Sequence, residues 1–250
     1  MAHLSLHFKL QSMPEFVHTA EIVKMIPESE SVKRFILKPQ TANPIAFKAG
    51  QFIVISFPTI DHMFPYRSYS IASSPHQSHI EICVVLKPDG AATPELFAMQ
   101  PGDKLEFTAP LGSFVLTEDL HEKELFLICT GTGIAPFRSM IQDIVERSVR
   151  IKKITLIFGC RTQQDLLYRK EWEALEKTMP QFSYIPVLSR ESWDGLQGYV
   201  HQAYLNKPEL MHNPNALFYI CGWTQMVKEA KNNLKQMGYK RNQIKFELYD

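Results

Sequence analysis

Two glycines, Gly131 and Gly133, lie directly between a predicted buried strand and a predicted helix. Residues 124–130 form an apolar run typical of a buried strand, and residues 135–147 favour a helix. Glycines at such a junction let the backbone turn tightly, and the N-terminus of the helix offers free N–H groups and a partial positive charge. The stretch from Thr130 to Pro136 therefore predicts a phosphate-binding loop. The alternative is a glycine turn that serves only the fold.

This loop departs from the usual dinucleotide fingerprint at the third glycine position. Pro136 stands there, and it suits the first turn of a helix because proline lacks an N–H that would have no partner in that turn. The next predicted strand ends at Gly159-Cys160-Arg161, without the acid that usually binds a ribose 2′-hydroxyl. The pattern indicates a nucleotide site that differs from the standard NAD-binding arrangement.

After Leu120, strands and helices alternate along the chain. The predicted strands are residues 124–130, 153–159, 182–188, 216–221 and 243–248, and the predicted helices are residues 135–147, 164–178, 199–206 and 224–237. Alternation of this kind is typical of βαβ units on a parallel sheet. Right-handed crossovers then give a doubly wound α/β domain that binds nucleotides.

Before Leu120, short runs of β-branched and aromatic residues are separated by prolines and glycines. The predicted strands are residues 16–26, 32–37, 52–57, 66–71, 80–86 and 104–107, with one helix near 93–99. This spacing predicts a small antiparallel β-barrel. We therefore expect an N-terminal arm at 1–14, a barrel domain at 15–120 and an α/β domain at 121–250, divided in the charged stretch 118–123.

Composition excludes several other classes of protein. The 250 residues suffice for two compact domains, and 45% hydrophobic with 21% charged residues is ordinary for a globular chain. No segment approaches the ~20 apolar residues of a membrane span. A formal net charge of +1 gives no electrostatic support for a nucleic-acid partner. We expect a soluble, cytoplasmic protein that is a monomer.

The charge and the cysteines add two further constraints. Residues 1–120 carry 9 Lys and Arg against 12 Asp and Glu, a net charge of −3, whereas residues 121–250 carry 18 against 14, a net charge of +4. The second half therefore suits an anionic nucleotide. The four cysteines lie far apart, which favours reduced thiols, and neither they nor the nine histidines have the spacing of a zinc or iron–sulfur site. We expect no metal.

Five short motifs resemble, in the same order, those of the ferredoxin–NADP reductase superfamily. They are Arg67-Ser68-Tyr69-Ser70, Gly90 with Thr93, Gly131 to Pro136, Cys221-Gly222, and Glu247 with Tyr249. The resemblance covers residues 15–250. It implies an FAD-binding barrel followed by an NAD(P)-binding domain, in an enzyme that passes electrons from NADPH or NADH through flavin to a small redox protein.

The resemblance also implies roles for residues of the barrel. Arg67 would hold the flavin pyrophosphate, Tyr69 would stack on the isoalloxazine ring, and Ser70 would bond near flavin N5. Ser68 and Ala92 belong to the same cofactor-binding segments, in which Gly90 and Thr93 would close the phosphate site. The alternatives are a core tyrosine at Tyr69 and a simple helix cap at Thr93.

In the second half, the resemblance places Cys221 beside the nicotinamide, with Tyr249 covering the flavin until the nicotinamide displaces it and Glu247 assisting. With Ser70, these residues form the expected catalytic set, while a buried hydrophobe at Cys221 and a packed strand-end tyrosine at Tyr249 are the alternatives. The chain departs from the plant-type pattern by continuing to Asp250. Thr130, Thr132 and Arg161 complete the expected nucleotide-binding residues.

Coenzyme choice depends on the end of the third strand of the second half. Ser189-Arg190 resembles the pair that contacts the 2′-phosphate of NADP, and Tyr199 resembles a residue that stacks on adenine. Gln197 stands where plant-type members have a lysine. NADP(H) is favoured and NAD(H) stays open.

The motifs do not name the electron acceptor. Without a cysteine-ligated cluster of its own, the chain is expected to use a separate ferredoxin, flavodoxin or oxygenase component. The alternatives are a reductase of free flavin or quinone, an FAD-carrying electron-transfer subunit without independent activity, and a non-catalytic nucleotide-binding module.

Overall fold

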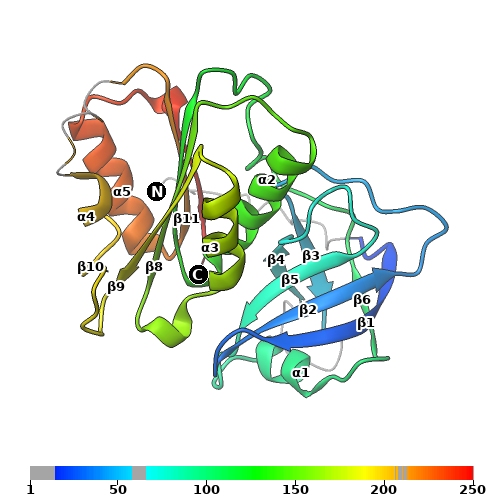
Figure 1. The fold of residues 1–250 in the computed structure, drawn as a ribbon. Coiled ribbons are helices and arrows are strands. Elements are labelled where there is room, and N and C mark those ends of the chain that lie inside the picture. Colours follow the sequence, from blue (N-terminus) through cyan, green and yellow to red (C-terminus); the bar gives the residue numbers. More distant parts are fainter. Residues whose placement is uncertain (1–14, 58–65, 206, 208–209, 211–212, 250) are drawn as a thin grey trace, which may run out of the picture.

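The computed structural model describes residues 15–57, 66–205, 207, 210 and 213–249. Two six-stranded sheets form its two parts, one antiparallel and one parallel. Figure 1 shows them side by side, with helices α2 and α3 between them. Residues 1–14 of the expected arm and Asp250 lie outside the described residues. In the described part of the chain, no helix is long and apolar enough to cross a membrane.

The first sheet is antiparallel and has the order β4-β3-β6-β1-β2-β5. Its strands are β1 (His18–Pro27), β2 (Val32–Pro39), β3 (Phe52–Ser56), β4 (Tyr66–Ser70), β5 (Ile80–Val85) and β6 (Lys104–Phe107), with helix α1 (Ala92–Ala98) between β5 and β6. A bridge between Ile71 and Ile82 joins the two edges of the sheet. The sheet therefore closes on itself, and the predicted antiparallel barrel is confirmed.

Alternating side chains of these strands fill the barrel. The buried residues include Ala20, Ile22, Phe35, Leu37, Ile53, Ile55, Ile82, Val84 and Phe107. Their two-residue spacing places one face of each strand inside the barrel. In β3 and β5 the other face is buried as well, at Val54, Glu81 and Cys83. The apolar pattern that predicted the strands is thus the pattern of the core.

The second sheet is parallel and has the order β10-β9-β8-β7-β11-β12. Its strands are β7 (Glu124–Thr130), β8 (Lys153–Cys160), β9 (Phe182–Leu188), β10 (Leu196–Gln197), β11 (Ala216–Gly222) and β12 (Ile244–Leu248). The chain builds outward from β7 to β10 and then crosses to β11 on the other side of β7. The topological switch point, where such sheets bind ligands, therefore lies between β7 and β11.

Helices cover both faces of the parallel sheet (Figure 1). They are α2 (Ala135–Glu146), α3 (Arg169–Thr178), α4 (Gln202–Leu205) and α5 (Thr224–Gln236), with short 3₁₀ turns at Gly131–Ile134, Gln163–Asp165 and Arg241–Gln243. Side chains of α2 and α3 share a core with Phe114, which precedes the sheet, whereas those of α4 and α5 pack on the opposite face. The predicted doubly wound domain is confirmed.

Two predicted helices differ in extent from those observed. The predicted helix at 164–178 is broken, because Tyr168 has a left-handed backbone with φ of 55° and α3 begins only at Arg169. The predicted helix at 199–206 is reduced to Gln202–Leu205 among the described residues, and the two-residue strand β10 was not predicted. Tertiary contacts of Tyr168 with the barrel, described below, explain the first difference.

Candidate functional site

The glycine loop lies at the switch point and packs directly on the end of β11. A Cβ atom at Gly133 would lie 2.6 Å from the carbonyl oxygen of Cys221 and 3.0 Å from Cα of Gly222. Gly131 adopts the left-handed φ of 53°, which L side chains rarely take. One glycine is required by close packing and the other by backbone conformation, so both belong to the geometry of the loop.

The loop leads into α2 with the positive end of that helix open. Pro136 occupies the first turn, and neither the 3₁₀ turn at Gly131–Ile134 nor α2 has a side-chain cap or an acidic residue in its first turn. Thr130 and Thr132 flank Gly131 at this end. The arrangement leaves backbone N–H groups for an anionic ligand.

Four residues expected to be catalytic meet between the two sheets. The Ser70 hydroxyl at the end of β4 donates a hydrogen bond of 3.1 Å to Oε1 of Glu247 in β12. Glu247 is the register partner of Cys221 in the neighbouring strand. The backbone N–H of Tyr249 donates to the carbonyl of Gly222 at 2.8 Å, which anchors the C-terminal segment beside the glycine loop.

The environment of these groups changes their acidity. Burial raises the pKa of Glu247, although the Ser70 hydrogen bond acts in the opposite direction. Burial raises the pKa of the Cys221 thiol well above its ordinary value, and the neighbouring Glu247 and Cys129 add to that effect. Cys221 is therefore a neutral thiol and not a thiolate nucleophile. Glu247 is able to hold a proton closer to neutrality than an ordinary carboxyl.

The Arg67–Ser70 strand presents a polar and aromatic surface next to this group. Ser68 is exposed, while Arg67 and Tyr69 are partly buried. The Tyr69 ring packs against the barrel core, yet its hydroxyl is buried with no hydrogen-bond partner among the described residues. Burial also raises the pKa of that hydroxyl, despite the nearby charge of Arg67. A buried hydroxyl without a partner is costly, and a ligand that supplied a partner would relieve that cost.

The turn before α1 closes on itself. The Thr93 hydroxyl accepts from the backbone N–H of Lys87 at 2.8 Å and lies 3.2 Å from its carbonyl, and Gly90 N–H donates to the same carbonyl. Because α1 begins at Ala92 and has no side-chain cap, the helix-cap alternative for Thr93 is wrong. The Thr93 hydroxyl is therefore engaged within the turn.

Two arginines occupy the ends of β8 and β9, where the usual acid is missing. The backbone N–H of Arg190 donates to the carbonyl of Arg161 at 3.0 Å, so the two residues are neighbours. Both are exposed, and in the described part of the chain no carboxylate pairs with either guanidinium. Ser189 donates its hydroxyl to the Cys160 carbonyl, and Tyr199 is 69% exposed. This edge of the sheet is suited to an anion.

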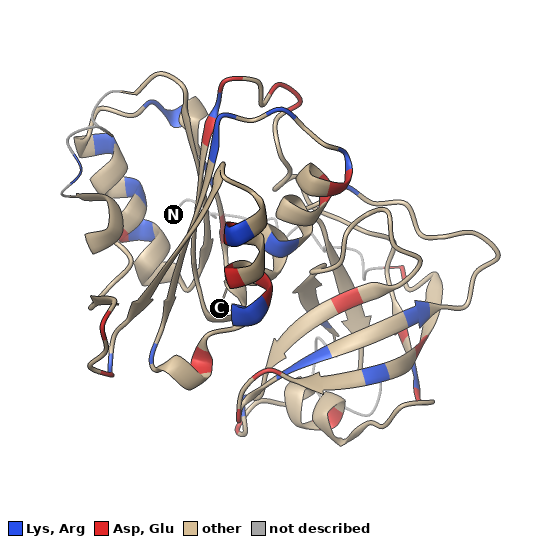
Figure 2. Ribbon diagram, viewed as in Figure 1, with Lys and Arg blue, Asp and Glu red and all other residues tan. Residues whose placement is uncertain are grey.

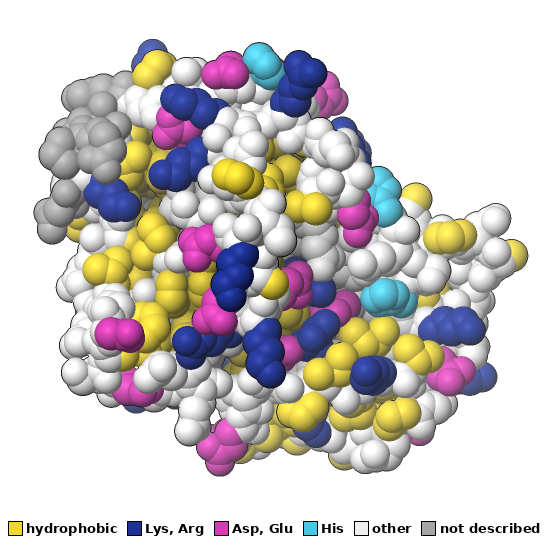
Figure 3. Space-filling model, viewed as in Figure 1, with side chains coloured by type: hydrophobic (Ala, Val, Ile, Leu, Met, Phe, Trp, Pro, Cys, Tyr) yellow, Lys and Arg dark blue, Asp and Glu magenta, His cyan; other side chains and the backbone are white. Residues whose placement is uncertain are grey.

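One group of residues was not predicted as functional. Residues of both charges lie on the elements that border the seam between the barrel and helices α2 and α3 (Figure 2), and charged side chains gather there on the surface (Figure 3). They include Arg34 and Glu81 from the barrel and Arg138 and Glu171 from the helices. Arg138 follows Pro136 of the glycine loop by two positions. The others are spread over the sequence and resemble ordinary surface charges.

Comparison with known proteins agrees with this geometry. Residues 19–116 match the model of the oxidoreductase FAD-binding domain, and residues 127–232 match that of the oxidoreductase NAD-binding domain. Ferredoxin–NADP reductase B of Sorangium cellulosum is 31% identical over 242 residues, which cover 92% of this chain and 97% of that protein. The chain belongs to the ferredoxin–NADP reductase superfamily. It is an oxidoreductase with the domains for FAD and NAD(P)H.

Other members of the superfamily differ in length. The phenol hydroxylase P5 protein of Acinetobacter pittii is 32% identical, over 88% of this chain but only 62% of that protein. Among solved structures, a ferredoxin NADP⁺ reductase from Neisseria gonorrhoeae with bound FAD and NADP has a TM-score of 0.77 and 28% identity, covering 92% of this chain and 97% of the other. This chain therefore spans nearly all of some relatives and little more than half of others.

Proposed function

We propose that this reductase takes a hydride from NADPH, or less readily from NADH, and passes the electrons one at a time to a separate small redox protein. The observation that carries the proposal is the meeting of Ser70, Glu247 and Cys221 beside the glycine loop. When bound, FAD supplies the chemistry, because flavin accepts two electrons as hydride and releases them singly. The domain division at 15–120 and 121–250 is part of this proposal.

The barrel residues fit FAD. The orphaned Tyr69 hydroxyl and the partly buried ring beside it offer one polar and one apolar contact to a planar ligand. Arg67, with its planar guanidinium, would bind the pyrophosphate, with Ser68 exposed beside it. Backbone N–H groups between Gly90 and Thr93, including that of Ala92, would complete the phosphate site.

The residues at the switch point would orient the nicotinamide, and Glu247 would hold a proton there. Ser70 holds Glu247 by a hydrogen bond, and burial lets Glu247 stay protonated more readily than an exposed acid. The neutral Cys221 would limit where the nicotinamide ring lies. Tyr249, anchored through its N–H to Gly222, would cover the flavin face and exclude water until the nicotinamide enters.

The exposed arginines favour NADPH. Arg161 and Arg190 lie together at the sheet edge, beside Ser189, where a 2′-phosphate would find two cations. Tyr199 is exposed and available to stack on adenine. Gln197 carries no charge, and its amide already donates to the Trp193 carbonyl at 3.1 Å, so it adds nothing to phosphate binding.

The acceptor is the least constrained part of the proposal. Relatives include a ferredoxin–NADP reductase and a phenol hydroxylase component, which supports ferredoxin, flavodoxin or an oxygenase protein as acceptor. Free flavin or quinone is the second candidate. The four cysteines are free thiols, which supports a reducing compartment such as the cytoplasm.

Anaerobic mixing of the FAD-loaded protein with NADPH or NADH tests the proposal, with flavin absorbance followed in a stopped-flow instrument. We expect bleaching by both coenzymes, with NADPH reaching half-saturation at the lower concentration. Ferredoxin, flavodoxin and a soluble quinone are then added separately to the reduced protein. A chain that binds FAD but is bleached by neither coenzyme would refute the proposal, and reoxidation by quinone alone would favour the second candidate.

A further inference from the structure

Helix α2 joins the glycine loop, which is the proposed nucleotide loop, to the segment that follows β4. We refer to β4 as the flavin strand, because its residues Arg67 to Ser70 are proposed to bind FAD. The helix begins where the glycine loop ends, and residues 71–76 continue directly from β4. Side chains along α2 bind this segment at successive points: Arg138 to the Ala72 carbonyl, Glu146 to the Ser74 hydroxyl and Asp143 to His76. The same helix thus contacts both halves of the expected reaction site.

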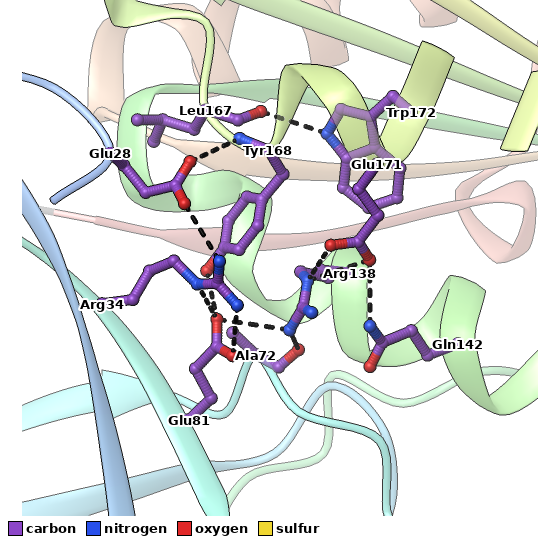
Figure 4. A network of polar contacts seen from close by, with 10 residues as sticks. All are labelled: Glu28, Arg34, Ala72, Glu81, Arg138, Gln142, Leu167, Tyr168, Glu171 and Trp172. Carbon is purple, nitrogen blue, oxygen red and sulfur yellow. Dashed lines mark hydrogen bonds and ion pairs between the residues drawn. The ribbon is translucent and has the colours of Figure 1, made fainter. Parts of the chain in front are cut away.

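Arg138 makes the most extensive of these contacts. Its guanidinium is buried and donates from Nη1 to the Ala72 carbonyl at 2.9 Å. The same Nη1 lies 3.2 Å from Oε1 of Glu81 in β5, and Nε lies 2.8 Å from Oε2 of Glu171 in α3 (Figure 4). One side chain on α2 therefore bonds to a backbone carbonyl after β4 and to carboxylates on both sides of the seam.

Tyr168 fills the space between two guanidinium groups. Its ring lies 4.9 Å from the Arg34 guanidinium carbon and 4.7 Å from that of Arg138. Its hydroxyl donates to Glu81 at 2.9 Å, and its backbone N–H donates to Glu28 at 2.9 Å (Figure 4). These bonds to two barrel carboxylates hold the left-handed backbone that interrupts the helix before α3.

The charges in this network are retained in the folded protein. Burial opposes ionisation of Glu81, but hydrogen bonding to Arg34 and the charges of Arg138 and Arg34 lower its pKa. Buried ion pairs of this kind add little stability over an apolar replacement, because desolvation offsets the attraction. These bonds instead fix the position of α2 relative to the barrel, because each bond requires one geometry. An apolar contact would let the two surfaces shift against each other.

We propose that Arg138 is a positioning residue that fixes the nucleotide loop relative to the flavin strand through α2. The inference rests on the proposed function. Hydride transfer needs reacting atoms held about 3–3.5 Å apart, and a misplacement of about 1 Å costs on the order of 100-fold in rate. A seam that tilts when Arg138 is removed would leave both ligands bound and slow the transfer between them.

The test compares Arg138→Met with Arg169→Met in the FAD-loaded protein. Arg169 is exposed on α3 and pairs only with Glu173 of the same helix in the described structure, so it controls for loss of an arginine. For Arg138→Met we expect flavin reduction at saturating NADPH to slow about 10- to 100-fold, while the dissociation constants of FAD and NADPH change less than about threefold. Arg169→Met should match the wild type.

Hydrogen exchange of the oxidised protein without nucleotide gives a readout independent of turnover. Arg138→Met should raise exchange both in residues 71–76 and in the first turns of α2, and Arg169→Met should raise neither. Wild-type transfer rates in Arg138→Met, or a loss confined to NADPH affinity, would overturn the inference. If the wild type shows no flavin reduction, the proposed function is refuted instead. Unchanged hydrogen exchange in Arg138→Met would still refute the inference that Arg138 holds α2 against residues 71–76.

His76→Ala keeps the test open should Arg138→Met fail to fold. The His76 side chain is 48% exposed and contacts Asp143 at 2.8 Å, so its removal leaves no large cavity. It should slow transfer in the same direction and raise exchange in the same two segments. Normal transfer and normal exchange in this variant would overturn the role of α2 in positioning.

Discussion

Replacing Glu81 by glutamine tests whether the charged seam is held together as the structure indicates. Glu81 is 2% exposed and accepts from Arg34 at 2.7 Å through Oε1 and 2.8 Å through Oε2, with the Tyr168 hydroxyl at 2.9 Å. Glutamine keeps the shape but loses the charge and one acceptor oxygen. Arg34 and Arg138 then face an amide N–H₂ group in a buried environment.

The expected loss can be bounded from the remaining partners. Removing one member of a buried ion pair costs about 3–5 kcal/mol. Here Arg34 keeps Glu28 at 3.1 Å and Arg138 keeps Glu171 at 2.8 Å, so the lower end applies. With about 2–4 °C per kcal/mol for a chain of this size, a loss of about 3 kcal/mol lowers the melting temperature by about 6–12 °C.

The dependence on pH has a definite sign. Because the folded pKa of Glu81 is lowered from the ordinary 4.5, its stabilisation is present above that value and is lost as the pH falls toward the lowered pKa. The gap in stability between wild type and Glu81→Gln should therefore be constant near neutrality and shrink on acidification. Urea unfolding of the FAD-loaded proteins, followed from neutrality to well below the ordinary value of 4.5, measures it.

Glu106→Gln is the matched control, because Glu106 is an exposed residue of the barrel strand β6. It should change the free energy of unfolding by no more than about 0.5 kcal/mol. A loss below about 1 kcal/mol in Glu81→Gln, or a gap that widens as the pH falls, would refute the view that Glu81 is an ionised member of the seam.

Three further substitutions address the site itself. Gly133→Ala places a Cβ 2.6 Å from the Cys221 carbonyl, so NADPH affinity measured by titration should fall while the flavin spectrum is kept; unchanged affinity would argue against loop binding. Glu247→Gln removes an acid that bonds to Ser70 and whose pKa is raised by burial. Because ionising this buried acid destabilises the wild type, the melting temperature of the variant should exceed that of the wild type by more as the pH rises through the raised pKa. Flavin reduction in the variant should slow. Arg190→Ala should weaken NADPH far more than NADH in reduction assays, and equal weakening would contradict the 2′-phosphate assignment.

The periodic parts of the structure could be predicted from the sequence because their cause is local. Short runs of β-branched and aromatic residues between prolines and glycines predicted the barrel strands. The pair Gly131 and Gly133 marked the loop whose packing on Cys221 requires a glycine. The meeting of Ser70 with Glu247, 177 residues later, is not visible in any local pattern. It could be expected only from the order of motifs in a family.

The seam could not be predicted, for a different reason. Tyr168 lies inside a segment whose local preference is helical, yet it has a left-handed backbone, is buried and bonds to Glu28 and Glu81. Arg34 is likewise indistinguishable in sequence from a solvated arginine, and the place of Arg138 next to the glycine loop does not reveal its contacts with Ala72, Glu81 and Glu171. Tertiary contacts decide these cases, and no pattern of neighbouring residues records them.

Two elements hold β4, the proposed flavin strand: the C-terminal segment on one side and helix α2 on the other. On one side the C-terminal segment reaches it, since Glu247 bonds to Ser70 and Tyr249 is anchored on Gly222. On the other side α2 reaches the residues after that strand through Arg138. Both supports start at the switch point, where the glycine loop packs on β11. Under the proposed function, a nucleotide bound at that loop would contact the same elements that hold β4, so binding and alignment would depend on one structural unit.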